Sequence, residues 1–267
     1  MRPFLKWAGG KYRLVERIKA KLPPGNRLIE PFAGSCALSL NTDYQDYWLN
    51  DINRDLINLY QVLQREGSNF IEYSRTFFTP ETNSAEKYYE FRKQFNAETD
   101  LVTKSALFIY LNRHGYNGLS RYNAGGEFNV PFGKYAKPYF PEKELIYFHT
   151  KFKKAKFTCI DFGTMMSKAK PGDLVYCDPP YEPLTETSNF TSYSAGGFGQ
   201  SEQKRLAEVA LRTAARGIPV LISNHRTDFI MEIYQKAKID TFPVRRFISC
   251  DGDNRKSVEE VLALFSK

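Results

Sequence analysis

The fold is decided by the stretch Asp173-Leu174-Val175-Tyr176-Cys177-Asp178-Pro179-Pro180-Tyr181. Its apolar part follows the turn residues Lys170-Pro171-Gly172 and predicts a short buried strand, which places Asp178 at the carboxyl end of that strand. In open α/β sheets, ligands bind beyond the carboxyl ends of the strands. We therefore expect a parallel sheet with a ligand site at Asp178.

The residues around Asp178 offer hydrogen-bond acceptors and a flat ring. Pro179 and Pro180 have no N–H, so this segment presents carbonyls beside a carboxylate, and Tyr181 adds a stacking face. The exocyclic amino group of a nucleobase has two N–H donors on a flat ring and matches this set. The alternative is a plain strand end followed by a proline turn, with Asp178 as its cap.

Length and charge narrow the class of protein. The chain has 267 residues, 42% of them apolar and 15% aromatic, which predicts an ordered protein with a substantial core. This length suits one large domain or a domain with an insertion. Lys and Arg exceed Asp and Glu by 38 − 30 = 8, which favours a polyanionic partner, although net charge alone does not identify one.

Cysteine spacing and hydropathy predict the compartment. There is no Cys-x-x-Cys motif and no Cys/His cluster, so we expect no metal site and a reduced, intracellular chain. The first residues lack the apolar run of a signal peptide, and no stretch of about 18 apolar residues occurs. We expect a cytoplasmic protein without membrane contact.

A nucleoside site is predicted near Gly34 and Asp51. Arg27 to Leu38 predicts a strand, a tight turn and a helix. A second strand, Tyr47 to Asn50, is followed by Asp51, which lies 51 − 34 = 17 residues past Gly34. At this position in nucleoside-binding α/β units, an acidic residue accepts from ribose hydroxyls. The turn lacks the extra glycines that admit a pyrophosphate, so we expect a nucleoside without phosphates. Alternatively, Asp51 caps the next helix, a role that Asn53 also suits.

The segment Phe4 to Lys11 places glycines and a lysine before a helical pattern. Glycines at a helix start let backbone N–H groups approach an anion, and Lys11 suits a carboxylate or phosphate partner. The spacing is not that of a P-loop, so triphosphate binding is not supported. The alternative is an N-terminal turn with a solvated lysine.

The pattern changes in the middle of the chain. Residues 53–148 show helical periodicity without the alternation of strands and helices, whereas strand signals return near Lys156, Asp173 and Ile218. The sequence predicts an α/β fold with a doubly wound, mostly parallel sheet formed by residues 1–52 and 149–267. Residues 53–148 are expected to form an inserted, mainly helical domain. Residues 242–249 predict a terminal strand, residues 258–265 a final helix or strand, and residues 185–199 a loop.

The stretch from Asn112 to Tyr139 is rich in Arg, Lys, Asn, Tyr and Gly. Phe128 to Val130 predicts a strand and Ala124 to Gly126 a turn, which together suggest a β-hairpin. Arg and Asn pair with base edges, Leu and Pro touch a thymine methyl group, and Tyr stacks or wedges between bases. The insertion therefore suits DNA recognition, with a solvated loop as the alternative.

These motifs occur in the chain order of amino-methyltransferases whose recognition insertion lies between the cofactor and catalytic motifs. From Phe4 to Leu264 the chain closely resembles the Dam family of DNA adenine N6-methyltransferases. The resemblance also covers Tyr110-Leu111-Asn112-Arg113 and Leu221 to His225. It implies a Rossmann-like methyltransferase fold, S-adenosylmethionine as methyl donor with S-adenosylhomocysteine as product, and duplex DNA containing GATC as substrate. It further implies base flipping, no metal, and a monomer associated with the nucleoid.

The resemblance also assigns roles to single residues. The implied catalytic residues are Asp178, Pro179, Pro180 and Tyr181. The implied cofactor-binding residues are Trp7, Lys11, Phe32, Gly34, Asp51 and Asp178. The implied DNA-binding residues are Lys6 at the first guanine, Tyr116 and Asn117 in the DNA stack, Leu119 and Pro131 at the thymine methyl group, Arg121 at the last guanine, and Lys134.

Two residues depart from the family pattern. Cys36 stands where relatives often have a glycine, and its Cβ is acceptable there if its φ angle is negative. Lys134 replaces an arginine that is common in relatives, which is expected to change a phosphate contact more than the choice of base.

Two other functions remain open from the sequence. The first is an enzyme with the same catalytic tetrapeptide that acts on cytosine N4, RNA or a protein glutamine, although the basic insertion disfavours protein substrates. The second is a DNA-binding regulator without catalytic activity, which the intact Asp178-Pro179-Pro180-Tyr181 disfavours.

Overall fold

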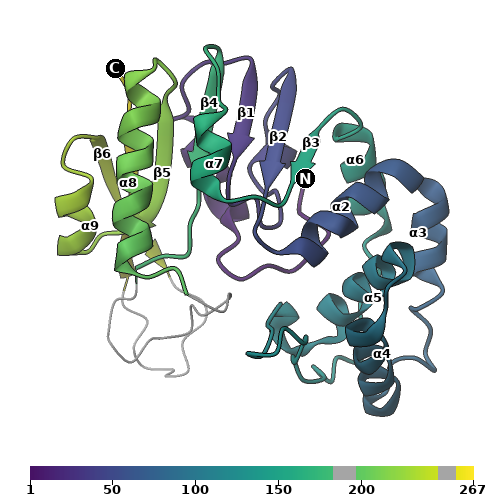
Figure 1. Ribbon diagram of the computed structural model, residues 1–267. Coiled ribbons are helices and arrows are strands. Elements are labelled where there is room, and N and C mark those ends of the chain that lie inside the picture. Colours follow the sequence, from purple (N-terminus) through teal and green to yellow (C-terminus); the bar gives the residue numbers. More distant parts are fainter. Residues whose placement is uncertain (183–196, 246–256) are drawn as a thin grey trace. The chain divides into compact units, whose positions relative to one another are not determined.

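The computed structural model describes residues 1–182, 197–245 and 257–267 (Figure 1). In these residues seven strands form one mostly parallel sheet, which confirms the predicted α/β class. The strands are β1 (Arg27–Glu30), β2 (Asp46–Asn50), β3 (Lys156–Thr158), β4 (Asp173–Cys177), β5 (Val220–His225), β6 (Lys238–Arg245) and β7 (Ser257–Phe265). The helices are α1 (Val15–Lys19), α2 (Arg54–Glu66), α3 (Ser68–Arg75), α4 (Ala85–Ala97), α5 (Leu101–His114), α6 (Glu142–Lys151), α7 (Phe162–Ser167), α8 (Gln200–Ala215) and α9 (Asp228–Ile233), with 3-10 turns η1 (Lys11–Leu14), η2 (Ser39–Asn41) and η3 (Tyr116–Gly118).

The chain divides into two compact units. The first unit contains residues 1–16 and 33–160, and the second contains residues 17–32 and 161–267. The functional boundaries expected from the sequence, after residues 52 and 148, remain a prediction.

In the second unit the strand order is β1-β4-β5-β7-β6. β1, β4 and β5 run parallel, whereas β7 is antiparallel to both β5 and β6. Arg27 lies opposite Asp173, and its guanidinium donates to both carboxylate oxygens at 2.9 and 2.7 Å, which fixes the register of β1 on β4. Every residue of β4 is buried, as expected for a central parallel strand.

The end of the chain is a strand rather than a helix. Residues 258–265, for which the sequence allowed either, lie in β7. The predicted strand at 242–249 begins earlier, as β6 from Lys238, and its residues 246–249 lie outside the described residues. The loop expected at residues 185–199 falls mostly on residues 183–196, which the structure does not describe.

Helix α8 packs against β5 and β7, and α7 and α9 pack against α8. Figure 1 shows these three helices on one face of the strands of the second unit. The side chains that α8 buries include Leu206, Ala210 and Thr213, spaced by three or four residues. This spacing puts them on one helical face, which is why the sequence pattern predicted the helix.

In the first unit, α5 is the central helix of the insertion. It contacts α2, α3 and α4, and its residues from Ser105 to Asn112 are all buried. Its neighbours begin at side-chain caps: Asn53 accepts from Leu56 N at the start of α2, and Ser84 accepts from Lys87 N at the start of α4. Asn53, not Asp51, therefore caps α2.

The β-hairpin predicted in the insertion is reduced to isolated antiparallel bridges, of which one joins Tyr122 to Phe128. The structure does not assign a strand to residues 128–130. Asn96 on α4 bonds both the N–H and the carbonyl of Phe128, at 2.8 and 3.1 Å, and Arg92 donates to the Val130 carbonyl. Because side chains of a helix satisfy this backbone, it needs no strand partner.

The helix expected after the Gly34 turn is absent; turns and the short η2 replace it in residues 33–41. Cys36 adopts a φ of +58°, a left-handed conformation that interrupts a right-handed helix. The condition under which a cysteine was expected to be acceptable here, a negative φ, is therefore not met. The side chain is fully buried and carries this strain inside the turn that follows Gly34.

His114 gives the first unit a pH-dependent stability. The ring is 1% exposed, stacks on Tyr110 with centroids 3.9 Å apart, and its Nδ1 lies 2.9 Å from the Tyr110 carbonyl oxygen. Burial lowers the pKa of His114 to about 4. The folded pKa is below the unfolded value of about 6.5, so this contribution is complete above pH 6.5 and is lost as the pH falls toward 4.

We expect the free energy of unfolding to fall by about 3 kcal/mol over this range because of His114. Urea unfolding of the wild type and of His114→Phe between pH 7 and pH 4 measures it. The carboxylates titrate in both proteins, so the difference between the pH dependences of their free energies of unfolding gives the contribution of His114. Equal pH slopes for the two proteins would contradict the prediction.

Among the helices of the described residues, none combines the length and the hydropathy that crossing a lipid bilayer requires.

Candidate active site and DNA interface

Strand β4 places Asp178 at the carboxyl edge of the sheet in the second unit. The chain enters β4 through Gly172, whose φ of +91° favours glycine. Asp178 is the first partly exposed residue after the buried strand. The hydroxyl of Ser223 on β5 donates to Asp178 Oδ1 at 2.9 Å, and Ser223 Oγ lies 3.0 Å from Tyr176 Oη. The neighbouring parallel strand therefore holds the carboxylate.

Tyr181 is fixed from two sides. Its ring meets the His225 ring edge-on, with centroids 4.7 Å apart, and its hydroxyl donates to Glu260 Oε2 at 3.2 Å. Burial, followed by the charges of Asp178 and Glu260, raises the pKa of Tyr181 well above its usual value. The phenol therefore stays protonated, and the partly exposed ring is held at a fixed place beside Asp178.

Phe32 belongs to the second unit and follows β1. It forms an aromatic cluster with Phe162 and Phe198, at centroid distances of 5.4 and 5.5 Å. Phe32 is partly exposed. Phe32, a predicted cofactor-binding residue, is thus packed against the rings of Phe162 and Phe198.

In the first unit, Asp51 and Gly34 meet directly. Gly34 N–H donates to Asp51 Oδ2 at 3.0 Å, and Asn53 N–H donates to Asp51 Oδ1 at 2.9 Å. Burial raises the pKa of Asp51, and these backbone donors oppose the shift. Tyr60 donates to the Gly34 carbonyl at 2.5 Å, so the Gly34 peptide is held on both sides.

Trp7 completes this cluster. Gly34 has a φ of +47°, and a Cβ at this position would lie 2.8 Å from Trp7 Nε1, so glycine is required there for two reasons. Lys11, in contrast, is buried and donates to the Gly9 carbonyl at 2.8 Å. Trp7 and Asp51 therefore both lie next to Gly34, while the described bond of Lys11 is to its own turn.

Lys6 is tied to the insertion by Asn112. The Asn112 side chain, 2% exposed, accepts from Lys6 N at 2.9 Å and donates to the Lys6 carbonyl at 2.8 Å and to the Gly118 carbonyl at 3.0 Å. A Cβ at Gly118 would lie 2.3 Å from Lys6 Cβ. The two predicted parts of the DNA interface, near Lys6 and near residues 116–119, are thus built as one surface.

Tyr135 joins this surface without having been predicted. Lys6 Nζ lies 4.1 Å from the centroid of the Tyr135 ring, and Asn117 N–H donates to the Tyr135 hydroxyl at 2.9 Å. Burial, and then the charge of Arg113, lowers the pKa of Lys6. Tyr116 is 52% exposed, and Asn117 has a φ of +52°, so both stand on a tight exposed turn.

The other predicted DNA-binding residues lie on the same insertion. Arg121 is exposed, and its guanidinium donates to Asn129 Oδ1 at 2.8 Å and to the Asn129 carbonyl at 3.2 Å. Pro131 accepts from Tyr116 N at 2.8 Å. The remaining two are Leu119, which is partly buried, and Lys134, which is exposed with a φ of +53°.

Sequence reasoning missed the residues that hold the predicted ones in place. Asn112 and Tyr135 support Lys6, and Ser223 supports Asp178. Ile52, 67% exposed directly after Asp51, adds an apolar surface beside the predicted ribose acceptor. One signal was available: the asparagine at position 112 directly follows the apolar run Ala106 to Leu111, where a polar side chain in the same helix indicates a buried polar contact.

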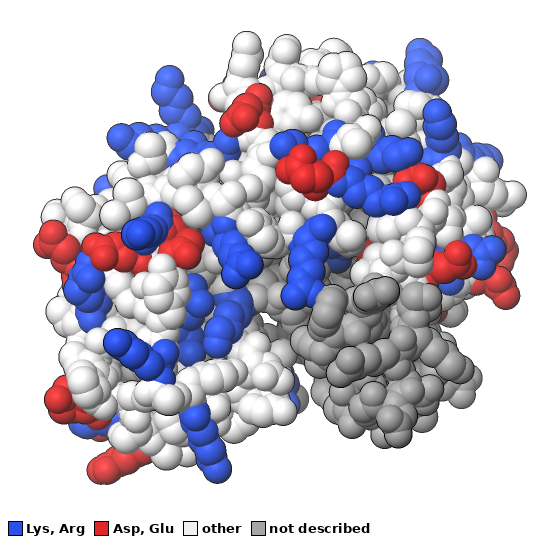
Figure 2. Space-filling view, turned by 180° about the vertical axis from the view of Figure 1, so that it is seen from behind, with Lys and Arg blue, Asp and Glu red and all other residues white. Residues whose placement is uncertain are grey.

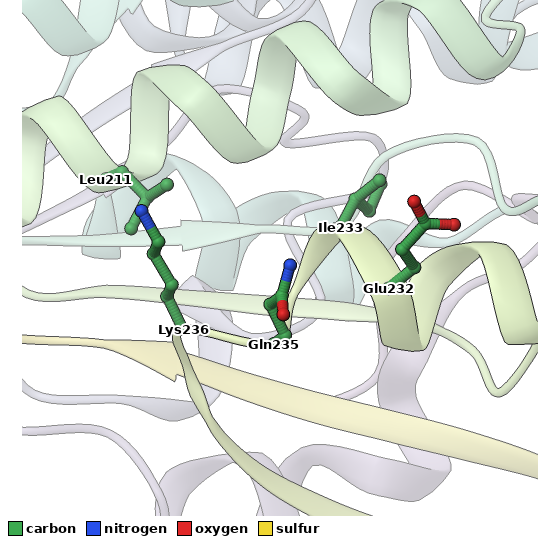
Figure 3. A pocket seen from close by; sticks show the side chains of 5 residues that line it. All are labelled: Leu211, Glu232, Ile233, Gln235 and Lys236. Carbon is green, nitrogen blue, oxygen red and sulfur yellow. The ribbon is translucent and has the colours of Figure 1, made fainter.

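Two hollows in the described parts of the chain are lined by residues other than the predicted site residues. One of about 200 Å³ lies beside α8 and the end of α9, where the Lys236 side chain points toward Leu211 (Figure 3). A second, of about 500 Å³, is lined in the first unit by side chains that include Tyr44, Tyr147 and Lys151. The candidate site is therefore argued from the chemistry of its side chains rather than from the shape of these hollows.

Figure 2 shows Lys and Arg side chains on the face that it presents, with Asp and Glu side chains among them. The formal net charge is +8. In the described ranges 1–182, 197–245 and 257–267, there is no group of three or more His, Cys, Asp and Glu residues that could hold a metal ion. The surface suits a polyanion.

Comparisons with known proteins cover almost the whole chain. The family described as "D12 class N6 adenine-specific DNA methyltransferase" matches residues 7–246. A DNA adenine methylase of Escherichia coli (strain K12) is 52% identical over 264 residues, covering 99% of this chain and 95% of the relative. Relatives of the same description from Salmonella typhi and Vibrio cholerae are 51% and 49% identical, each covering 99% of this chain and 95% and 96% of their own length. The chain belongs to the D12 class of N6 adenine-specific DNA methyltransferases.

Proposed function

We propose that the protein methylates N6 of adenine in duplex GATC, with S-adenosylmethionine as the donor and with the target base flipped out of the helix. The observation that carries this proposal is the Asp178 carboxylate, which Ser223 holds at the end of β4 and which the partly exposed Tyr181 ring follows. A flipped adenine offers a flat ring and two N–H donors, which this set of groups complements. A monomeric state and a nucleoid location are part of the same proposal.

Asp178 and the Pro179 carbonyl accept the two N6 protons in this proposal. The Pro180 carbonyl already accepts from Gln203 Nε2 at 2.8 Å, which leaves the preceding carbonyl to the substrate. An aromatic amine is a poor nucleophile because its lone pair is delocalised into the ring. Two acceptors favour a pyramidal nitrogen whose lone pair is free to react, and Tyr181 orients the base by stacking.

The residues of the first unit suit the nucleoside part of S-adenosylmethionine. Asp51 Oδ2 accepts from Gly34 N–H and Oδ1 from Asn53 N–H, and a carboxylate with about four lone-pair sites suits an acceptor of ribose hydroxyls. The exposed Ile52 suits the face of a base, and Gly34 keeps the backbone free of a Cβ next to Trp7. We also assign Lys11, Phe32 and Asp178 to this ligand. When bound, it supplies an electrophilic methyl group on a sulfonium.

The insertion reads the DNA in this proposal. Lys6 and Arg121 suit the guanines at the two ends of the site, since cationic side chains bind guanine O6 and N7. Leu119 and Pro131 suit the thymine methyl group. The exposed Tyr116, with Asn117, suits the space that a flipped base leaves, at a cost of a few kcal/mol for unstacking. Lys134 suits a backbone phosphate.

Methylation of plasmid DNA tests the proposal. Purified protein and S-adenosylmethionine are incubated with a plasmid, which is then digested by restriction enzymes that distinguish methylated from unmethylated GATC. Protection at GATC, with N6-methyladenine found by mass spectrometry, is the expected result. A matched plasmid without GATC is the control, and unchanged cutting of GATC would exclude the site assignment.

Replacing Arg121 with alanine should relax the choice of the last base pair of the site. Losing one bidentate contact to guanine costs about 1–3 kcal/mol of discrimination, which is about 5- to 150-fold in relative kcat/KM. Rates on duplexes that differ only at that base pair measure the effect. Lys134→Ala is the matched control, expected to weaken binding to all sequences alike and to reduce its salt dependence. Unchanged discrimination by Arg121→Ala would contradict the role of Arg121.

A further inference from the structure

Two buried amides lie behind the catalytic tetrapeptide. Gln203 on α8 and Asn224 on β5 are both fully buried. Gln203 Nε2 donates to the Pro180 carbonyl at 2.8 Å, and Asn224 Nδ2 donates to Gln203 Oε1 at 3.0 Å. Asn224 Oδ1 accepts from Glu182 N at 3.1 Å and from His225 N at 2.9 Å. The pair thus bonds the backbone on both sides of Tyr181.

The direction of each hydrogen bond is determined by the backbone groups at the two ends of this hydrogen-bonded series. The Pro180 carbonyl only accepts, so Gln203 must turn its NH2 group toward it. The N–H groups of Glu182 and His225 only donate, so Asn224 must present its oxygen to them. The amide of Asn224 then donates to the oxygen of Gln203. Each side chain can take only one orientation, and no carboxylate or apolar residue reproduces the set.

We propose that Gln203 and Asn224 are positioning residues for the methyl-accepting site. They engage the Pro180 carbonyl and hold the Pro180 to Glu182 backbone, which leaves the Pro179 carbonyl and the Tyr181 ring at fixed places for the base. Gln203 acts from a helix and Asn224 from a strand, so the tetrapeptide is anchored to both layers of the second unit. This inference rests on the proposed function of Asp178 and its neighbours.

The first test replaces Gln203 with methionine, which keeps the shape of the side chain and removes its hydrogen bonds. Steady-state kinetics on a GATC duplex should show kcat lower by about 10- to 100-fold, because small misplacements of reacting groups are costly. KM for DNA and for S-adenosylmethionine should change by less than about threefold, since the residue contacts neither ligand in the proposal. A Gln203→Met protein that is folded by circular dichroism and retains wild-type kcat would overturn it.

The second test uses Gln203→Glu and a pH profile. A neutral Glu donates its O–H to the Pro180 carbonyl and accepts from Asn224. An ionised Glu has no proton to donate, so a carboxylate oxygen would face the Pro180 carbonyl oxygen, and both only accept. Burial disfavours the ionised form, and no Lys or Arg bonds either amide in the described parts of the chain. The titratable residues that bond Asn224 are Glu182 and His225, through their backbone N–H groups, and Tyr234, through its hydroxyl.

The kcat of Gln203→Glu, divided by that of the wild type at each pH, should rise about tenfold between pH 8.5 and pH 6. The same ratio for Gln203→Met should stay flat, because methionine has nothing to protonate. Gln235→Glu makes the same change of charge at an exposed residue and should follow the wild type. Circular dichroism at each pH checks that Gln203→Glu stays folded, so that a loss of folded protein at high pH does not produce the same rise.

The outcomes separate the inference from the function on which it rests. A flat ratio for Gln203→Glu would overturn the positioning role even if kcat is low at every pH. If the wild type leaves GATC unmethylated, the proposed function fails before any variant is compared. If the wild type methylates GATC and both variants match it, only the positioning role is wrong.

Discussion

Asp178→Ala is expected to lower the rate of adenine methylation by about 10³-fold or more, while sequence-selective DNA binding is retained. The substitution removes the acceptor that favours a reactive N6 lone pair, and losses of single groups that act in the transition state reach this size. DNA recognition is assigned to residues of the other unit, such as Lys6 and Arg121, so it should not depend on this carboxylate. The measurement is single-turnover transfer of a labelled methyl group, with fluorescence anisotropy for DNA affinity.

Two matched variants sharpen the Asp178 result. Asp178→Asn keeps one oxygen and removes the charge, so its rate should fall between those of the wild type and Asp178→Ala. Ser223→Ala removes the donor 2.9 Å from Asp178 Oδ1 and leaves the carboxylate, so its loss should be about tenfold or less. Wild-type activity in Asp178→Ala would exclude the proposed mechanism.

Asp51→Asn is expected to weaken binding of S-adenosylmethionine by about 100-fold or more. Hydrogen bonds to a charged group contribute about 1.5–3 kcal/mol each, and two ribose hydroxyls are assigned to this carboxylate. Both oxygens also accept backbone N–H groups, from Gly34 and Asn53. In asparagine, the NH2 group has to face one of these donors whichever way the amide is turned. Isothermal titration calorimetry of the free protein with S-adenosylmethionine measures the change.

Asn53→Ala is the control for Asp51→Asn. Asn53 caps α2 through Leu56 N at 3.0 Å, so its loss should lower stability by about 1 kcal/mol. Its backbone N–H still donates to Asp51, and cofactor affinity should stay within about threefold of the wild type. Wild-type affinity in Asp51→Asn would show that Asp51 is only a structural acceptor for the Gly34 turn.

The sequence by itself determined the elements whose cause is local. The apolar run Leu174 to Cys177 and the turn before it specified β4, because burial on both faces requires continuous apolar residues. The spacing of buried residues specified α2 and α8, and Asn53 marked the start of α2. The motif Asp178 to Tyr181 predicted a site for a flat amine, since it combines acceptors and a ring at a strand end.

Only the tertiary structure decided which groups hold these elements in working positions. Asn112 bonds Lys6 across 106 residues, Ser223 bonds Asp178 across 45, and Asn96 replaces the strand predicted at Phe128. The left-handed φ of Cys36 likewise departs from its local expectation. The three hydrogen bonds share one physical reason. A polar group that becomes buried needs a hydrogen-bond partner, and packing often supplies that partner from a residue far away in the sequence. The periodicity of the sequence does not predict which residue this is.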